Sequence, residues 1–269
     1  MTTENYSAQE PLPLVTIITV VKNGKDFIQE TMNSVFDQDY KNIEYIVLDG
    51  NSDDGTVEII KNNQQYISYW QSEPDSGIYN AMNKGIQLST GLYIGFLNAS
   101  DLLYPDAVSR LAFAHKELLF QYTLGPVHIK NPTLDQISTL KPKKGFTSKR
   151  YKNIEMPAGH LSIFMRVDFI KSLGMFDEQF KLSADLDLMI RAIKKSTDIW
   201  YFQDPVGIFK LGGVSGSYST AIENFYVMKK NKIPFIYCLY LLAKNFIGIS
   251  LRLLIPARIL QHIVITSKN

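Results

Sequence analysis

The sequence predicts an α/β fold with a mostly parallel central sheet flanked by helices, followed by a helical C-terminal tail. Three observations predict it: strand-like and helix-like segments alternate along the first hundred residues, the strand-like segments are continuous apolar runs, and these runs stop at polar residues. Continuous apolar runs are typical of strands that helices cover on both faces of a parallel sheet. The 269 residues suffice for one large or two small domains, and the apolar content of 45% is a globular value.

The first elements follow one another as strand, helix, strand and helix. Residues 14–21 are rich in β-branched side chains, and this segment ends at the turn 22–24. Residues 26–36 carry apolar side chains at near-helical spacing. Residues 43–48 form a second apolar run, and 57–63 is the next predicted helix. Elements in this order predict parallel strands joined by right-handed crossovers.

The following segments complete a Rossmann-like first half. Residues 66–71 are a candidate third strand, 72–77 a loop, 78–88 a helix and 91–97 a further buried strand. Open α/β sheets bind ligands in the crevice outside the carboxyl ends of their strands. We therefore expect a ligand site at the edge of the sheet where these strands end.

Asp101 lies at that edge, because it follows the apolar strand 93–97 directly after Asn98, Ala99 and Ser100. Position alone allows two interpretations: a residue on the metal or phosphate side of a ligand, or a cap of the next segment. The chain contains neither Gly-x-Gly-x-x-Gly nor Gly-x-x-x-x-Gly-Lys-Ser/Thr, so a dinucleotide fingerprint and a P-loop lose their main support.

The second half is less periodic. Residues 105–119 are predicted as a helix, and 161–165 form another apolar run. A helical stripe of apolar residues begins at Leu186, and Asp185 lies at the N-terminal end of that helix. Residues 141–152 are rich in lysine and arginine; such a stretch is either a solvated loop or a contact to an anionic ligand or membrane.

The C-terminal tail differs from the rest in charge. After Glu223 it carries seven basic residues and no acidic one, and since the whole chain is +2, residues 1–223 carry −5. The apolar run 233–243 is interrupted by Pro234 and is shorter than the about 20 residues that span a bilayer. We expect one or two amphipathic helices on an anionic membrane surface. The alternative is a helical pair packed on the main domain or on a second subunit.

The remaining composition limits compartment and partner. Cys238 is the only cysteine, which excludes an internal disulfide and fits a reducing compartment. Residues 1–11 show no basic region followed by an apolar one, so we expect no signal peptide. Nucleic-acid binding is not expected, because the body is negative and the basic residues of the tail stand beside apolar ones.

Five segments of the chain resemble, in order, the blocks of inverting family 2 glycosyltransferases with the GT-A fold. They are residues 16–23, 45–56, 73–88, 91–101 and 184–191, and the resemblance covers roughly residues 14–215. It is strongest in Glu73-Pro-Asp-Ser-Gly-Ile-Tyr-Asn-Ala-Met-Asn-Lys-Gly85, which is similar to bacterial polysaccharide transferases of the colanic-acid type. No single block is decisive, but five in the right order are specific.

The resemblance implies a division of the chain. We expect an N-terminal arm at 1–13 and a GT-A domain at 14–225, with a nucleotide-sugar half at 14–110 and an acceptor half at 111–225. A basic, apolar helical tail would follow at 226–269, for membrane association or for assembly into a homo-oligomer.

The resemblance also implies ligands and site residues. The donor would be a nucleotide-diphosphate sugar, with a UDP-sugar favoured, and the cofactor a divalent cation, Mn²⁺ or Mg²⁺. By position, Asp101 matches the metal-binding carboxylate and Asp185 the catalytic base; the alternative for Asp185 is an N-cap of its helix. His160 is a candidate contact to acceptor or diphosphate. The implied nucleotide-sugar contacts are Thr19, Val21, Asp49, Asp75, Lys84 and Asn98.

Three positions depart from the family pattern. Ser100 stands where an aspartate is usual beside the metal ligand, Ala184 replaces the acid before the base, and Asn80 replaces a common aspartate. Hard cations prefer several carboxylate oxygens, so the first departure bears on metal affinity. These departures leave an alternative function, a nucleotide-sugar-binding scaffold without turnover.

The resemblance as a whole implies an inverting transfer to a hydroxyl group in cell-surface polysaccharide biosynthesis. The acceptor would be a glycan or a lipid-linked glycan. We therefore expect a cytoplasmic enzyme that is peripheral on the inner face of the cytoplasmic membrane.

Overall fold

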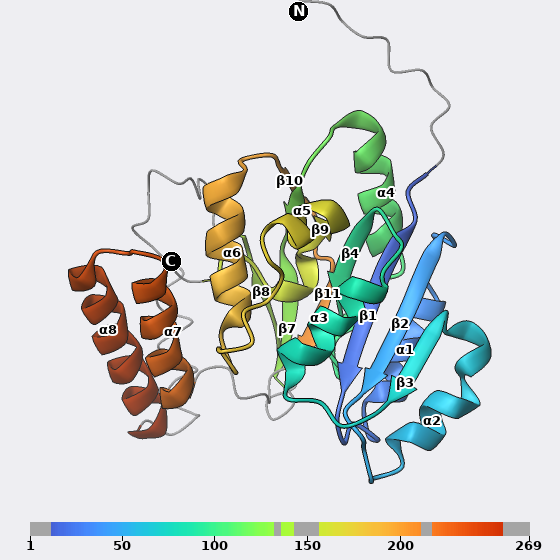
Figure 1. The fold of residues 1–269 in the computed structure, drawn as a ribbon, viewed down its shortest axis with the longest axis horizontal. Helices are drawn as coiled ribbons and strands as arrows, with labels where there is room; N and C mark the ends of the chain where they lie inside the picture. The colour runs from blue at the N-terminus through green and yellow to red at the C-terminus, as the bar shows by residue number, and fades with distance from the viewer. Residues whose placement is uncertain (1–11, 132–135, 143–155, 211–216, 255–269) are drawn as a thin grey trace, which may run out of the picture.

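The computed structural model describes residues 12–131, 136–142, 156–210 and 217–254, and its centre is a seven-stranded sheet in the order β10-β6-β9-β4-β1-β2-β3 (Figure 1). Its strands are β1 Val15–Val21, β2 Ile43–Asp49, β3 Tyr69–Ser72, β4 Tyr93–Phe96, β6 Tyr122–Leu124, β9 Phe164–Arg166 and β10 Ile199–Tyr201. Strand β9 runs antiparallel to β4 and β6, whereas the other pairs of this sheet are parallel. The predicted α/β fold with a mostly parallel sheet is confirmed.

Helices cover both faces of this sheet. The helices are α1 Ile28–Phe36, α2 Thr56–Asn62 and α4 Ala107–Glu117 on one face, and α3 Ile78–Leu88, α5 Val167–Ser172 and α6 Ala184–Lys195 on the other. Successive side chains of a strand point to opposite faces. Accordingly, Ile17 and Val21 of β1 pack in the cluster of α1, α2 and α4, while Ile18 and Val20 pack in the cluster of α3, α5 and α6.

The predicted elements of the first half are confirmed with small shifts at their ends. The helix predicted at 78–88 is α3, and the first two strands begin and end within one residue of their predicted bounds. The third strand begins at Tyr69, later than the predicted start at residue 66, because Gln64–Tyr66 forms a 3-10 turn. In the second half, α4 is shorter than the predicted 105–119.

A second, four-stranded sheet was not predicted. It contains β5 Leu102–Leu103, β11 Gly207–Lys210, β7 Val127–Asn131 and β8 Gln136–Leu140, in that order. Strand β5 directly follows Asp101 and pairs antiparallel with β11. As a result, the backbone N–H of Lys210, at the end of β11, donates a 3.2 Å hydrogen bond to the Asp101 carboxylate.

The C-terminal helices α7 Tyr218–Lys230 and α8 Phe235–Leu254 lie side by side at the end of the molecule next to α6 (Figure 1). Val227 of α7 and Cys238 and Leu241 of α8 are buried in the cluster that also holds α6. The helical tail is therefore confirmed, and its described part packs against the main domain. The boundary expected between residues 225 and 226 falls inside α7.

The length and hydropathy of the helices bear on membrane insertion. Over the described residues, no helix combines the length and the hydrophobicity that crossing a membrane requires.

Candidate active site

The carboxyl ends of β1, β2, β3 and β4 meet at one edge of the sheet, and Asp49 ties two of them together. Asp49 is the last residue of β2 and is only 3% exposed. Its carboxylate accepts hydrogen bonds from the backbone N–H of Ser52 (2.9 Å), the Ser52 hydroxyl (2.5 Å) and the hydroxyl of Ser72 at the end of β3 (2.6 Å). An ionised carboxylate has about four acceptor positions, so Asp49 can accept one further donor from a ligand.

Asp75 and Lys84, two of the predicted nucleotide-sugar contacts, line one small pocket with Asp49. Asp75 accepts a 2.9 Å hydrogen bond from the backbone N–H of Gly77, which fixes the turn before α3. Lys84 forms an ion pair with Glu73, a residue that the sequence did not single out. The end of β2, the loop after β3 and helix α3 thus bring together three of the predicted contacts. A phosphate that binds Lys84 would compete with Glu73.

Thr19 and Val21 lie deeper in the sheet than a direct ligand contact requires. Thr19 is fully buried, and its hydroxyl pairs with the hydroxyl of Tyr45 at 3.0 Å. Val21 ends β1 with a buried side chain, while its carbonyl accepts a 2.8 Å hydrogen bond from Gly50. Both side chains are packed inside the protein beneath the surface of this edge. Their assignment to the pocket for the nucleotide base stays a prediction.

Asn98, Asp101 and His160 form a cluster beyond the end of β4. His160 lies in the 3-10 turn His160–Ser162, which precedes β9, the antiparallel neighbour of β4. Its Nε2 is 3.0 Å from Asn98 Nδ2 and 3.7 Å from Asp101 Oδ2. Both Asn98 Oδ1 and Asp101 Oδ2 are buried and without a hydrogen-bond partner. Buried polar atoms are nearly always paired, so two unpaired oxygens on residues that both contact His160 are candidate ligand-binding atoms.

Burial controls the charge of this cluster. It raises the pKa of Asp101 to about 7, against the opposing backbone N–H and charge of Lys210. It also lowers the pKa of His160 to about 4. His160 is therefore neutral at pH 7, and its 3.7 Å contact with Asp101 is not an ion pair. A neutral imidazole has one nitrogen lone pair, and because an amide nitrogen can only donate, His160 Nε2 uses that lone pair to accept the hydrogen bond from Asn98 Nδ2.

Asp185 lies in the first turn of α6, one residue after the helix begins at Ala184. The predicted alternative of an N-cap is not realised, because the cap position belongs to Ser183. One oxygen of Asp185 accepts hydrogen bonds from the backbone N–H of Leu186 (2.8 Å) and from the Tyr79 hydroxyl (3.2 Å). Burial raises the pKa of Asp185, while these two donors lower it.

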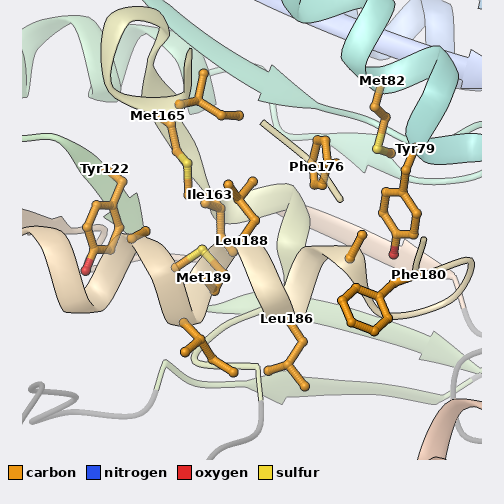
Figure 2. Close-up of a cluster of buried hydrophobic side chains, with 14 of the residues drawn as sticks. Tyr79, Met82, Tyr122, Ile163, Met165, Phe176, Phe180, Leu186, Leu188 and Met189 are labelled. Atoms are coloured by element: carbon orange, nitrogen blue, oxygen red, sulfur yellow. The ribbon is translucent and has the colours of Figure 1, made fainter. Parts of the chain in front are cut away.

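One pocket connects Asp185 with the cluster of Asn98 and His160. These three polar residues line it together with Tyr79 and Phe176, whose rings lie 5.2 Å apart, and the cavity volume is about 80 Å³. Apolar side chains make up most of the wall. In Figure 2, Met82 and Phe176 lie near Tyr79, and Met165 and Met189 lie on the other side of Leu188. Asp101 is not among the lining residues, so His160 stands between its carboxylate and the pocket. Helix α3 lines both this pocket and the one that contains Asp49.

The donor atoms near Asp101 fit a divalent cation in part. Asp101 Oδ2 and Asn98 Oδ1 are buried oxygens without a hydrogen-bond partner, whereas His160 Nε2, 3.7 Å from the first, already accepts from Asn98 Nδ2. Carboxylate and carbonyl oxygens suit Mn²⁺ and Mg²⁺. Within the described ranges, no three His, Cys, Asp or Glu side chains are arranged to hold a metal. A cation here would therefore need ligands from the phosphates of a substrate and from water, as Mg²⁺ commonly does in proteins.

The three departures from the family pattern have distinct surroundings. Ser100 has a φ of 143°, a conformation that residues other than glycine rarely adopt, and its N–H donates to Thr31 Oγ1 at 3.0 Å. Ala184 is fully buried in the core, and the amide of Asn80 donates to Glu178 at 3.0 Å. Only Ser100 thus lies directly beside the Asp101 cluster.

Two residues near Asp185 escaped the sequence analysis. Tyr79 bonds Asp185 across a large separation in sequence, and Glu223 of α7 contributes negative charge near it. Tyr79 falls in the strongest block of the resemblance, which was a signal for its importance. Most of the basic stretch 141–152 lies outside the described residues.

A family model and several relatives match this chain. The model described as Glycosyl transferase family 2 matches residues 16–173. An uncharacterised glycosyltransferase of Mycobacterium tuberculosis is 32% identical over 186 residues, which cover 67% of this chain and 69% of that protein. Chondroitin synthase of Pasteurella multocida is 26% identical over 226 residues, 82% of this chain but only 22% of that enzyme.

Solved structures resemble the fold at low sequence identity. Residues 1–349 of Staphylococcus aureus TarS in complex with UDP give a TM-score of 0.62 at 15% identity, covering 86% of this chain and 70% of that one. The mannosyltransferase PcManGT from Pyrobaculum calidifontis, in complex with GDP-Man and Mn²⁺, gives a TM-score of 0.59 at 16% identity, covering 88% and 75%.

Proposed function

The chain belongs to glycosyl transferase family 2, and we propose that it transfers a sugar from a UDP-sugar to a hydroxyl of a glycan or lipid-linked acceptor, with inversion, in cell-surface polysaccharide biosynthesis. Its relatives include proteins named as glycosyltransferases and a chondroitin synthase, and a structural neighbour was solved with UDP, which supports a transferase with a nucleotide-sugar donor. The nucleotide, the stereochemistry, the acceptor and the pathway are the proposal.

The donor is assigned to the ends of β2, β3 and β4. Asp49 has an acceptor position left for an N–H of the base, and Asp75 before α3 and Lys84 within α3 line the same pocket. TarS was solved with UDP, which supports uracil, whereas PcManGT was solved with GDP-Man. Lys84 would place positive charge near the diphosphate after exchanging its partner Glu73.

The base is assigned to Asp185. Transfer to a hydroxyl requires that its proton leaves during attack, and a carboxylate in hydrogen-bond reach can accept it. The raised pKa of Asp185 improves it as a base, because catalysis is most efficient when the pKa lies near the working pH. Attack from the face opposite the leaving diphosphate inverts the anomeric carbon and needs no covalent nucleophile on the protein.

A divalent cation is assigned to Asp101, with His160 and Asn98 as its neighbours. When bound, it would act as a Lewis acid that offsets the charge on the leaving diphosphate. The Mn²⁺ in the PcManGT complex supports this assignment. His160 and Asn98 also lie on the wall of the Asp185 pocket, where they can orient the sugar or the acceptor.

The single observation that carries the proposal is that Asn98 and His160 lie beside Asp101 and also line the pocket that contains Asp185. Asn98 contacts His160, His160 contacts Asp101, and both line the pocket that holds Asp185. The carboxylate on the leaving-group side and the carboxylate on the acceptor side are therefore joined by two polar side chains.

The test is release of nucleotide diphosphate from a panel of UDP-, GDP-, ADP- and dTDP-sugars. Purified protein is mixed with each donor in Mn²⁺, Mg²⁺ or chelator, with membrane lipid extract as acceptor. We expect cation-dependent release from one UDP-sugar. Calorimetric binding of a donor without release would instead favour the scaffold without turnover, and no binding to any donor would contradict the donor site.

We also propose that the outer face of α8 docks on an anionic lipid surface at the inner side of the cytoplasmic membrane. Ile236, Tyr240, Ile247 and Leu251 lie on one side of the helix, and their exposed fractions are 71, 62, 61 and 49%. The chain after Glu223 carries seven basic residues and no acidic one, which favours an anionic surface as the partner of this stripe.

The docking proposal is tested by sedimentation with vesicles of phosphatidylglycerol or of phosphatidylcholine. We expect binding to the first and loss of binding in Ile236→Ser/Ile247→Ser, whereas the exposed pair Phe113→Ser/Leu118→Ser on the α4 side should bind normally. A wild-type protein that ignores the vesicles and sediments as a dimer, which the same two substitutions disrupt, would assign the stripe to a second copy and contradict docking.

A further inference from the structure

We propose that α7 is a positioning element of the active site: Glu223 and the pair Lys230 and Asn231 hold the first turn of α6, and Asp185 with it, from both sides. The inference rests on the proposed role of Asp185 as the base. The boundary that the sequence predicts between the GT-A domain and the tail falls inside α7. The inference assigns the whole of α7 to the GT-A domain.

The first contact is made by Glu223, near the middle of α7. Its two carboxylate oxygens accept hydrogen bonds from the backbone N–H groups of Lys181 (2.8 Å) and Leu182 (2.6 Å). These residues immediately precede Ser183, the N-cap of α6. Hydrogen bonds to an ionised acceptor are roughly twice as strong as neutral ones, so Glu223 fixes the backbone just ahead of Asp185.

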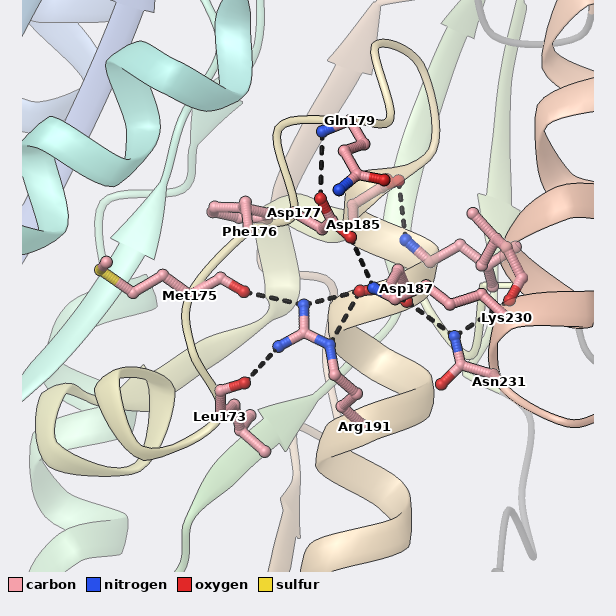
Figure 3. A network of polar contacts seen from close by, with 12 residues as sticks. Leu173, Met175, Phe176, Asp177, Gln179, Asp185, Asp187, Arg191, Lys230 and Asn231 are labelled. Carbon is pink, nitrogen blue, oxygen red and sulfur yellow. Dashed lines mark hydrogen bonds and ion pairs between the residues drawn. The ribbon is translucent and has the colours of Figure 1, made fainter.

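The second contact is made at the end of α7 (Figure 3). Asp187 is fully buried, and it accepts hydrogen bonds from Asn231 Nδ2 (2.7 Å), Lys230 Nζ (3.1 Å) and Arg191 Nε (2.8 Å). It also forms an ion pair with Arg191 Nη2 at 2.8 Å. A buried carboxylate is tolerated only with such partners. Because Asp187 follows Asp185 by two residues in the same turn, α7 also fixes the backbone just behind the base.

The same network reaches the partner of Asp185 on α3. Arg191 donates to the backbone carbonyls of Leu173 (2.6 Å) and Met175 (2.7 Å), which holds the turn that presents Phe176. The Phe176 ring lies 5.2 Å from the ring of Tyr79, and the Tyr79 hydroxyl bonds Asp185. Asp187 therefore helps to fix both Asp185 and the Tyr79 hydroxyl that donates a hydrogen bond to it.

Among the residues that the structure describes, Tyr79 of α3 donates to Asp185, Glu223 of α7 places negative charge near it, and His160 beside β9 lines the same pocket. On α6 itself, Asp187 follows two residues later. The negative charge of Glu223 adds to burial in raising the pKa of Asp185. Removing that charge should lower the pKa, so that the base stays ionised to a lower pH.

The experiment compares Glu223→Gln and Asn231→Ala in the full chain. A misplaced base costs rate without affecting the donor pocket, so we expect kcat to fall about tenfold with an unchanged KM for the donor. In Glu223→Gln, the acid limb of the kcat–pH profile should also move to lower pH by a few tenths of a unit. Glu223→Asp keeps the charge and should restore the position of the limb.

The control is Glu117→Gln, because Glu117 is an exposed carboxylate at the end of α4. If the wild type is active and Asp185→Asn is not, but both α7 variants match this control, the inference about α7 is wrong while the proposed function stands. A lower kcat that only follows a smaller folded fraction, with an unmoved acid limb, would also overturn it. If Asp185→Asn keeps full activity, the proposed role of the base fails first.

Discussion

Replacing Tyr79 with phenylalanine isolates one hydrogen bond to the base. The hydroxyl of Tyr79 donates to Asp185 at 3.2 Å, and its ring packs on Phe176. Phenylalanine keeps the apolar ring and its packing, so the fold should be retained. The hydrogen bond stabilises the ionised carboxylate, so its loss must raise the pKa of Asp185.

The size of the effect follows from the geometry. A hydrogen bond to a charged group contributes about 1.5–3 kcal/mol, and the length of 3.2 Å places this one at or below the lower end, about 1 kcal/mol. One pKa unit corresponds to about 1.36 kcal/mol, so the pKa of Asp185 should rise by roughly 0.7 units. Since the base acts when ionised, the acid limb of the rate profile should move to higher pH by that amount.

The assay is the initial rate of nucleotide diphosphate release between pH 5 and 9, at saturating donor and acceptor. At pH values well above the limb, the variant should approach the wild-type rate. Tyr66→Phe, at an exposed tyrosine in the turn before β3, is the matched control. A limb that stays in place or moves to lower pH in Tyr79→Phe would refute the assignment of this hydrogen bond to the base.

Three further outcomes are expected. Asp49→Ala leaves the serine donors around it unpaired, so it should lower the free energy of unfolding by about 1–3 kcal/mol in urea and abolish donor binding in calorimetry. Mn²⁺ should raise the melting temperature of the wild type but not that of Asp101→Asn. In the wild type this rise should become smaller below pH 7, because burial raises the pKa of Asp101 to about 7 and a protonated carboxyl does not bind cations. Gly207→Ala places a Cβ against the Leu102 carbonyl oxygen between β11 and β5, so it should lower the free energy of unfolding by about 1–3 kcal/mol or more. In Gly248→Ala of α8 the new Cβ meets nothing within 4 Å, so this variant should be neutral or more stable. Equal melting temperatures for the two variants would contradict this packing.

The first half of the fold was predictable from local pattern. Its strands are apolar runs covered on both faces, and α3 was predicted with its observed bounds because its buried stripe is regular. The second sheet could not be predicted from local sequence pattern. All five residues of β8 are exposed, β5 has two residues, and β5 pairs with β11 across about a hundred residues of chain. No local periodicity encodes such pairings.

The candidate site divides in the same manner. Asp49 and Asp101 were identified because they follow buried strands that a parallel sheet brings to one edge. Glu223 and Tyr79 act through contacts between elements far apart in sequence, which only the packed structure shows. The sequence marked Glu223 as the last acid before the basic tail, but it gave no reason to connect that residue with Asp185.

The most direct test of the central claim compares donor binding and turnover in Asp185→Asn. Asparagine keeps the shape of the side chain but cannot accept the proton of the acceptor. We expect an unchanged donor Kd and a loss of turnover of about 10²–10⁴-fold, while Asp198→Asn, an exposed aspartate before β10 at the opposite edge of the sheet, keeps both. Full turnover in Asp185→Asn would contradict the account, because the pocket that joins Asp185 to Asn98 and His160 would then not be the place of the reaction.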